Sequence, residues 1–229
     1  MVSALFRVGL AAFALALTVG CSTLARVNGA KTLEPGQTQI GVSGSLQQGA
    51  NPLSTGTIPL PQGEVFVRRG LLPNLDMGAR LYLVGAGMDV RYRFYEGERL
   101  HLAINPSYGL VMVPFVGSVR GSGSLDVRVP LIAEWELGPR SSIAGGPTLV
   151  LRRQRNDFTW SLGAEETARV LRLDAYAGAG LRYSTTRGRV ILGVNADLYA
   201  QTARHAGPAY AVGADLSFVP QLPKKTPRR

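Results

Sequence analysis

The chain has 229 residues and a formal net charge of +10, and 45% of its residues are hydrophobic. It contains a single cysteine, which excludes an internal disulfide, so the fold must be stabilised in another way. After residue 20 there is no run of about 18 consecutive apolar residues, which excludes a protein that crosses a membrane with helices.

Residues 1–20 have the features of a secretory signal peptide. One basic residue, Arg7, precedes the apolar run Val8–Val19, which is too short to cross a bilayer as a helix. We therefore expect residues 1–20 to be removed during export. An exported chain does not meet nucleic acid, so the positive charge predicts no nucleic-acid partner.

The end of this segment, Leu17-Thr18-Val19-Gly20-Cys21, resembles a bacterial lipobox. In that motif the cysteine is acylated and becomes the mature N-terminus, although Thr18 stands where leucine is usual. The resemblance implies a lipoprotein anchored through Cys21, and Ser22 after it favours export to the outer membrane. The alternative is ordinary signal cleavage with Cys21 incidental.

Residues 21–37 are polar and contain Pro35-Gly36, so we expect a lipid-anchored tether there. Beyond it, residues 38–219 alternate apolar and polar side chains with period two, which is typical of β-strands. This alternation predicts about ten strands, with about eight as the alternative. The expected strands are 38–47, 63–70, 75–84, 87–95, 99–112, 123–136, 141–154, 169–184, 188–201 and 208–219.

Period two does not say which face is buried, but the export signal favours a membrane setting. A transmembrane barrel places its apolar register against lipid and its polar register in the lumen. We therefore predict an all-β fold, a closed antiparallel up-and-down transmembrane β-barrel. It would be integral to the outer membrane of a Gram-negative bacterium and lipid-anchored at the periplasmic face.

The alternative architecture is a soluble, lipocalin-like lipoprotein that binds a lipid. That family's Gly-x-Trp near the first strand is missing, because Trp135 and Trp160 both come late in the chain. A lipocalin also needs an apolar lumen, whereas the polar register here is heavily charged.

The predicted connections alternate in length. They are tight around 73–74, 96–98, 138–140 and 185–188, and longer over 48–62, 113–122 and 155–168. Short periplasmic turns with longer extracellular loops are typical of outer-membrane barrels. An even number of strands returns both termini to the periplasm.

The inward register carries similar numbers of basic and acidic residues, and arginine supplies the cations. This combination favours bidentate arginine–carboxylate pairs between neighbouring strands. A barrel of about eight strands has little more interior than its own side chains fill, so we expect a closed, rigid lumen. A narrow small-solute channel remains the alternative. The predicted network comprises Arg68, Asp76, Arg80, Asp89, Arg91, Arg93, Asp126, Arg128, Glu134, Arg172, Asp174, Arg182, Arg189, Asp197 and Asp215.

Aromatic residues end the outward register on strands that run toward the periplasm. They are Phe94, Trp135, Tyr183 and Phe218, where an interfacial girdle is expected. Glycines inside the strands, such as Gly78, Gly180 and Gly193, leave room for large lumen side chains.

Catalytic and cofactor motifs are not evident, so we expect no enzyme, no cofactor and no metal site. The only histidines, His101 and His205, fall near opposite ends of the predicted barrel and cannot share a site.

The expected partners are membrane components. Outer-membrane lipids would surround the barrel, and lipopolysaccharide phosphates would lie within reach of Arg120, Arg153, Arg155, Arg169 and Arg204. The basic tail, residues 220–229, is expected to be disordered and to contact the cell wall or anionic lipid. Barrel-insertion machinery typically reads a terminal strand that ends in Phe, and here residues 219–229 follow Phe218.

One hairpin adds a resemblance to a family. Residues 64–80, with Arg68, Arg69-Gly70-Leu71, Asn74-Leu75-Asp76 and Gly78-Ala79-Arg80, resemble a hairpin common in small proteobacterial outer-membrane β-barrel proteins. The resemblance implies the barrel fold and names no substrate.

Overall fold

The structure, a computed structural model, describes residues 28–48, 60–82, 85–116, 119–161, 165–201 and 208–220. It is built from strands alone, and no helix in these ranges is long and apolar enough to span a membrane. The strands are β1 (Thr38–Gln48), β2 (Leu60–Leu72), β3 (Leu75–Tyr82), β4 (Gly85–Glu96), β5 (Leu100–Ile104), β6 (Ser107–Val116), β7 (Val119–Gly138), β8 (Ser141–Ser161), β9 (Glu165–Arg187), β10 (Val190–Gln201) and β11 (Ala209–Phe218).

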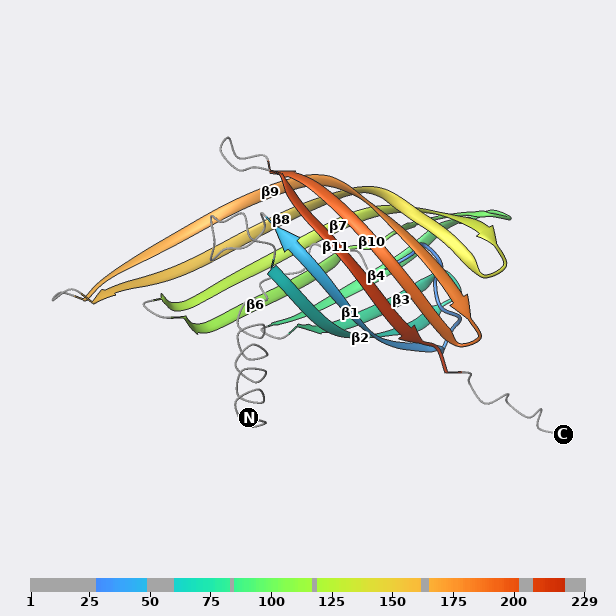
Figure 1. Cartoon of the computed structure of the whole chain (residues 1–229), viewed down its shortest axis with the longest axis horizontal. Coiled ribbons are helices and arrows are strands. Elements are labelled where there is room, and N and C mark those ends of the chain that lie inside the picture. Colours follow the sequence, from blue (N-terminus) through green and yellow to red (C-terminus); the bar gives the residue numbers. More distant parts are fainter. Residues whose placement is uncertain are drawn as a thin grey trace, which may run out of the picture.

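The strands close into an antiparallel barrel (Figure 1). Closure comes from β1, which pairs with β2 on one side and with β11 on the other. The barrel has ten strands because β5 and β6 act as one: both lie between β4 and β7. The predicted closed, ten-stranded barrel is therefore confirmed.

The expected strand 99–112 is interrupted at Asn105-Pro106, between β5 and β6. Proline has no N–H to donate to a ladder, so regular pairing stops there. The Asn105 N–H instead donates to the Pro130 carbonyl at 3.1 Å, and the Pro106 carbonyl accepts from the Val90 N–H at 3.0 Å. These bonds keep the interrupted strand in the wall.

The two ends of the barrel differ. One end, called the turn end, has the short connections after β2, β4, β7 and β9, and also the start of β1 and the end of β11. At the other end, called the hairpin end, β6–β7 pairing continues to Val116 and Val119, and β8–β9 pairing continues to Ser161 and Glu165. The expectation of loops over 113–122 and 155–168 was therefore wrong, and the long β8–β9 hairpin projects from the barrel (Figure 1).

The wall exposes its apolar face and buries its polar face, which is the reverse of the arrangement in a soluble barrel. On β10, Leu192, Val194 and Leu198 point outward and are 49%, 54% and 61% exposed, whereas Asn195 and Asp197 point inward and are buried. The same alternation runs through β2, where Val65 and Val67 are exposed and Glu64 and Arg68 are buried. The outer surface is thus an apolar belt, and the lumen holds the polar side chains.

Glycines on the inward register make room for these side chains, as the sequence predicted. A Cβ on Gly193 would lie 2.2 Å from Asp215 and 2.4 Å from Arg182. A Cβ on Gly180 would overlap the Asp197 carboxylate. Only glycine lets these lumen groups lie against the neighbouring strand.

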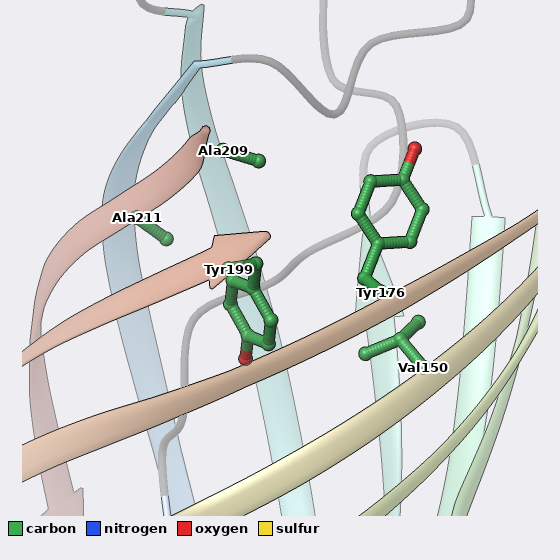
Figure 2. Packing of buried hydrophobic residues seen from close by; sticks show 5 residues of the cluster. All are labelled: Val150, Tyr176, Tyr199, Ala209 and Ala211. Atoms are coloured by element: carbon green, nitrogen blue, oxygen red, sulfur yellow. The ribbon is translucent and has the colours of Figure 1, made fainter. Parts of the chain in front are cut away.

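An apolar cluster fills the lumen toward the hairpin end. It consists of Val150, Tyr176, Tyr199, Ala209 and Ala211, contributed by β8, β9, β10 and β11 (Figure 2). The Arg152 guanidinium lies 5.5 Å from the centre of the Tyr176 ring, a cation–π contact that joins this cluster to the charged residues.

Candidate functional site: the charged lumen and its plug

Five charged side chains from β2, β3 and β4 form one connected group, here called the β2–β4 cluster: Arg68, Asp76, Arg80, Asp89 and Arg91. Arg68 bridges Asp76 and Asp89 through its two Nη atoms. Arg80 Nη2 donates to Asp89 at 2.9 Å, and Arg91 Nε donates to Asp76 at 3.2 Å. Their positions follow from the register, which sets Gly78 between Arg68 and Asp89 on the neighbouring strands.

The β2–β4 cluster is deeply buried, and each carboxylate has more than one partner. Asp76 is 0% exposed and Arg68 is 2% exposed. Charges removed from water to this extent are tolerated only when paired and hydrogen-bonded. Asn105 supplies a further bond, because its Nδ2 donates to Asp89 Oδ1 at 2.8 Å.

A second group, the β9–β11 cluster, lines the other side of the lumen. Arg182 Nη2 donates to Asp215 Oδ1 at 2.8 Å, across Gly193 of the intervening strand β10. On β10 itself, Asn195 Nδ2 donates to Asp197 at 3.0 Å. The four polar side chains of this cluster are all buried: Arg182, Asn195, Asp197 and Asp215.

A separate bidentate pair joins β7 and β8. Arg152 Nε and Nη2 donate to the two Asp126 carboxylate oxygens at 2.8 and 2.9 Å, and Arg152 is 0% exposed. On β9, Asp174 accepts from Gln201 Nε2 at 2.8 Å. This geometry is the strand-to-strand arginine–carboxylate pairing that the inward register predicts.

The N-terminal segment was expected to be a tether over 21–37, but of its described part, 28–37, the first six residues enter the barrel. Residues 28–33, here called the lumenal plug, enter the lumen at the turn end, and Ala30 within them is 0% exposed. Ala30 packs against Ala103, Ile132 and Ala144 on the inner wall. The segment is held because its backbone N–H groups donate to carboxylates in the lumen. The sequence of the segment, which is polar and has no periodicity, gives no sign of these bonds.

The plug is bound mainly through its backbone. Glu134 Oε2 accepts from the Ala30 and Lys31 N–H groups at 2.6 and 3.0 Å, and Asp76 Oδ2 accepts from the Leu33 N–H at 3.0 Å. Arg91 Nη1 donates to the Gly29 carbonyl at 2.9 Å. The wall thus satisfies peptide groups that would otherwise be buried without partners.

Side chains of the plug add contacts at different depths. Asn28 Nδ2 donates to Asn105 Oδ1 at 2.7 Å in the interior, and Thr32 Oγ1 donates to the Pro73 carbonyl at the turn end. Lys31 Nζ lies 2.6 Å from Glu136 Oε1, which also contacts His101 Nε2 at 2.9 Å. The chain therefore runs from mid-lumen at Asn28 outward to the rim.

Several residues of the predicted network lie elsewhere. Arg93 sits at the turn-end rim, where it donates to the Pro73 carbonyl and pairs with the exposed Glu96 at 2.8 Å. Arg189 is exposed in the turn after Gly188, not in the lumen. Arg128 does lie in the lumen, where it borders a cavity with Arg80 and Asp126, and the side chain of Arg172 lies outside the described residues.

These departures have local causes. A register shift between Arg93 and Tyr95 breaks the alternation at the end of β4, and the positive φ of Gly188 (63°) ends it between β9 and β10. Sequence reasoning also missed Asn105 and the plug residues. A polar residue on the inward register directly before Pro106 was the available signal for Asn105.

The four predicted girdle residues are all exposed on the outer surface near the turn end: Phe94, Trp135, Tyr183 and Phe218. Trp135 and Tyr183 both pair with Ile143, so they form one row across β7, β8 and β9. Phe218 is the last residue of β11 and pairs with Ile40 of β1. Cys21, His205 and the tail beyond residue 220 lie outside the described residues.

No protein-family model and no curated protein matches the sequence. Among solved structures, the chain is similar to Neisserial surface protein A, with 12% identity over 80% of this chain and 95% of that one and a TM-score of 0.41. It is also similar to the Yersinia pestis outer membrane protein Ail (13%, 80% and 99%, TM-score 0.35) and to the N-terminal β-barrel domain of Pseudomonas aeruginosa OprF (11%, 81% and 100%, TM-score 0.29). These TM-scores and identities are low, so the description of the fold depends on the strand pairing of this chain and not on the similar structures.

Proposed function

We propose that this protein is an integral β-barrel of a Gram-negative outer membrane, with a closed lumen and a structural or surface-interaction role. The observation that carries the proposal is the inverted burial: leucines and valines cover the outside, and paired charges fill the inside. Exposed apolar surface on this scale is costly in water and favourable in hydrocarbon. The turn end would face the periplasm, since short turns lie on that side in outer-membrane barrels.

The closed lumen supports a role that needs no transport. The β2–β4 and β9–β11 clusters occupy opposite sides, and the lumenal plug lies between them at the turn end. Surface interaction would then fall to the hairpin end, where β7, β8 and β9 are 20, 21 and 23 residues long. The soluble lipocalin-like alternative would need the opposite burial of the two faces.

Heat-modifiable migration of the wild-type protein tests the membrane barrel. We expect the protein in the outer-membrane fraction, running on gels at a different position before and after boiling, because a folded barrel resists detergent. Recovery in the soluble periplasmic fraction, with one band under both conditions, would contradict the proposal.

Acylation at Cys21 is part of the same proposal. It is supported by the lipobox resemblance and by the chain's having one cysteine at that position. Replacing Cys21 with alanine is expected to abolish incorporation of labelled palmitate, while Ser22→Ala, the matched control, keeps it. Palmitate in the Cys21→Ala protein would rule out this anchor.

Lipopolysaccharide is the partner we propose for the outer face. Arg153 is exposed on β8 directly beyond Leu149 and Leu151 of the apolar belt, and it pairs with Leu173 of β9. An arginine at the boundary between apolar and polar surface is placed for lipid phosphates. The expected contact of the basic tail with the cell wall or anionic lipid, and recognition by the insertion machinery, belong to the same proposal.

A further inference from the structure

We propose that the lumenal plug, residues 28–33, is a displaceable gate, and that its withdrawal opens an aqueous path for small hydrophilic solutes. This goes beyond a closed structural barrel and rests on the proposed membrane placement. The gate is a segment of the chain itself, and the turn end is the side from which it enters.

The wall does not depend on the plug for its own charge pairing. If the plug leaves, Asp76 keeps Arg68 and Arg91, and Glu134 keeps the Ser142 hydroxyl at 2.6 Å. Asn105 likewise keeps Asp89 as a partner. Withdrawal therefore leaves no buried charge of these groups without a partner, which is the condition that would make it prohibitive.

The plug is held by polar contacts more than by buried apolar side chains. Four of its hydrogen bonds join it to Glu134, Asp76 or Arg91 and are stronger than neutral ones, but water that enters as the segment leaves can replace each of them. The side chain that it buries most deeply is the methyl group of Ala30. Its one ion pair, from Lys31 to Glu136, lies at the rim, where the two side chains are 45% and 28% exposed.

A hollow already runs beside the plug. A cavity of about 170 Å³ at the turn end is lined by plug residues, by Arg91 of the β2–β4 cluster and by Arg182 of the β9–β11 cluster. This volume corresponds to about five or six water molecules. Farther in, Asn28 borders a smaller cavity with Glu64 and Arg80. Asn28 lines both cavities, so the inner end of the plug lies at the boundary between them.

Displacement of the plug can be forced at Gly29. A Cβ there would lie 2.4 Å from Glu134 Oε2, so Gly29→Leu cannot fit without expelling the segment or the carboxylate that holds it. The matched control is Gly44→Leu, because Gly44 faces outward and an added Cβ meets nothing within 4 Å. A second variant, Ala30→Pro with Leu33→Pro, removes two N–H donors to the wall and alters no residue of the strands.

Ion-current steps in planar bilayers are the readout for the full-length proteins. We expect rare openings for wild type and Gly44→Leu, and openings about tenfold or more as frequent for Gly29→Leu and for the double proline variant, since each loses bonds that hold the closed state. Added potassium chloride alone serves as the conducted solute.

The proposal is overturned if the double proline variant, folded as judged by its heat-shifted band, conducts no more often than Gly44→Leu. It is also overturned if wild type already conducts as often as that variant. Should Gly29→Leu fail to fold, the proline variant decides alone. Failure of the membrane placement would appear separately, as wild-type protein in the soluble fraction.

Discussion

Asp76→Ala is expected to destabilise the barrel by about 3–5 kcal/mol, because it leaves two guanidinium groups buried without their shared carboxylate. Asp76 is 0% exposed and pairs with both Arg68 and Arg91, and it also accepts from the Leu33 N–H. The free energy of unfolding, from urea titration in lipid vesicles followed by tryptophan fluorescence, measures the effect.

Glu96→Ala is the matched control for this substitution. Glu96 also pairs with an arginine, Arg93, but at the rim, where its side chain is 60% exposed. Exposed ion pairs contribute about 0–1 kcal/mol to stability, so the free energy of unfolding of the control should lie within about 1 kcal/mol of the wild-type value. If the two alanine variants lose the same stability, the β2–β4 cluster does not form the buried network described above.

Leu198→Arg is expected to cost about 2–4 kcal/mol, because it places a charge on the lipid-facing register far from the girdle at the turn end. Leu198 is 61% exposed on β10 and lies between Ala179 of β9 and Tyr210 of β11. The same urea titration measures the effect, and Leu198→Ile, which keeps an apolar side chain, should stay close to wild type.

Depth provides a second control for this prediction. Leu173 is 74% exposed but pairs with Arg153 at the end of the apolar belt. The cost of an outward arginine falls to about 0–1 kcal/mol near the interface, so Leu173→Arg should be milder than Leu198→Arg. Two near-neutral substitutions would instead mean that water, not lipid, surrounds the barrel.

Period-two alternation was sufficient to predict the barrel wall. The expected start at residue 38 and end at 219 fall within one residue of β1 and β11, because each strand has one apolar and one polar face. Beyond the belt this signal disappears. The hairpin extensions of β6–β7 and β8–β9 are held by backbone pairing outside the apolar belt, so residues 113–122 and 155–168 looked like loops.

The lumen was predictable in kind but not in detail. Alternation placed Arg68, Asp76 and Asp89 on one register, and neighbouring strands with the right register bring them together. Arg189 was assigned to the inward register by the same alternation, yet it lies in a turn. The alternating pattern of the sequence continues through the turn, so it does not mark where the chain reverses.

The plug could not be predicted from its own residues. Its seat depends on Glu134 and Asp76, which lie 104 and 43 positions along the chain from the amides that they accept. Such long-range hydrogen bonds leave no periodic pattern in the sequence, and a polar segment with Pro35-Gly36 has the composition of a linker.

Spin-label accessibility along β10 tests most directly which face of the wall meets lipid. Single cysteines at Leu192 and from Val194 to Tyr199, in a Cys21→Ala chain, would carry the label in lipid vesicles. We expect dissolved oxygen, which concentrates in hydrocarbon, to relax the labels at positions 192, 194, 196 and 198 strongly and those at 195, 197 and 199 weakly. The reverse alternation, or even-numbered labels that respond to a water-soluble nickel reagent instead, would contradict a barrel with its apolar face in lipid.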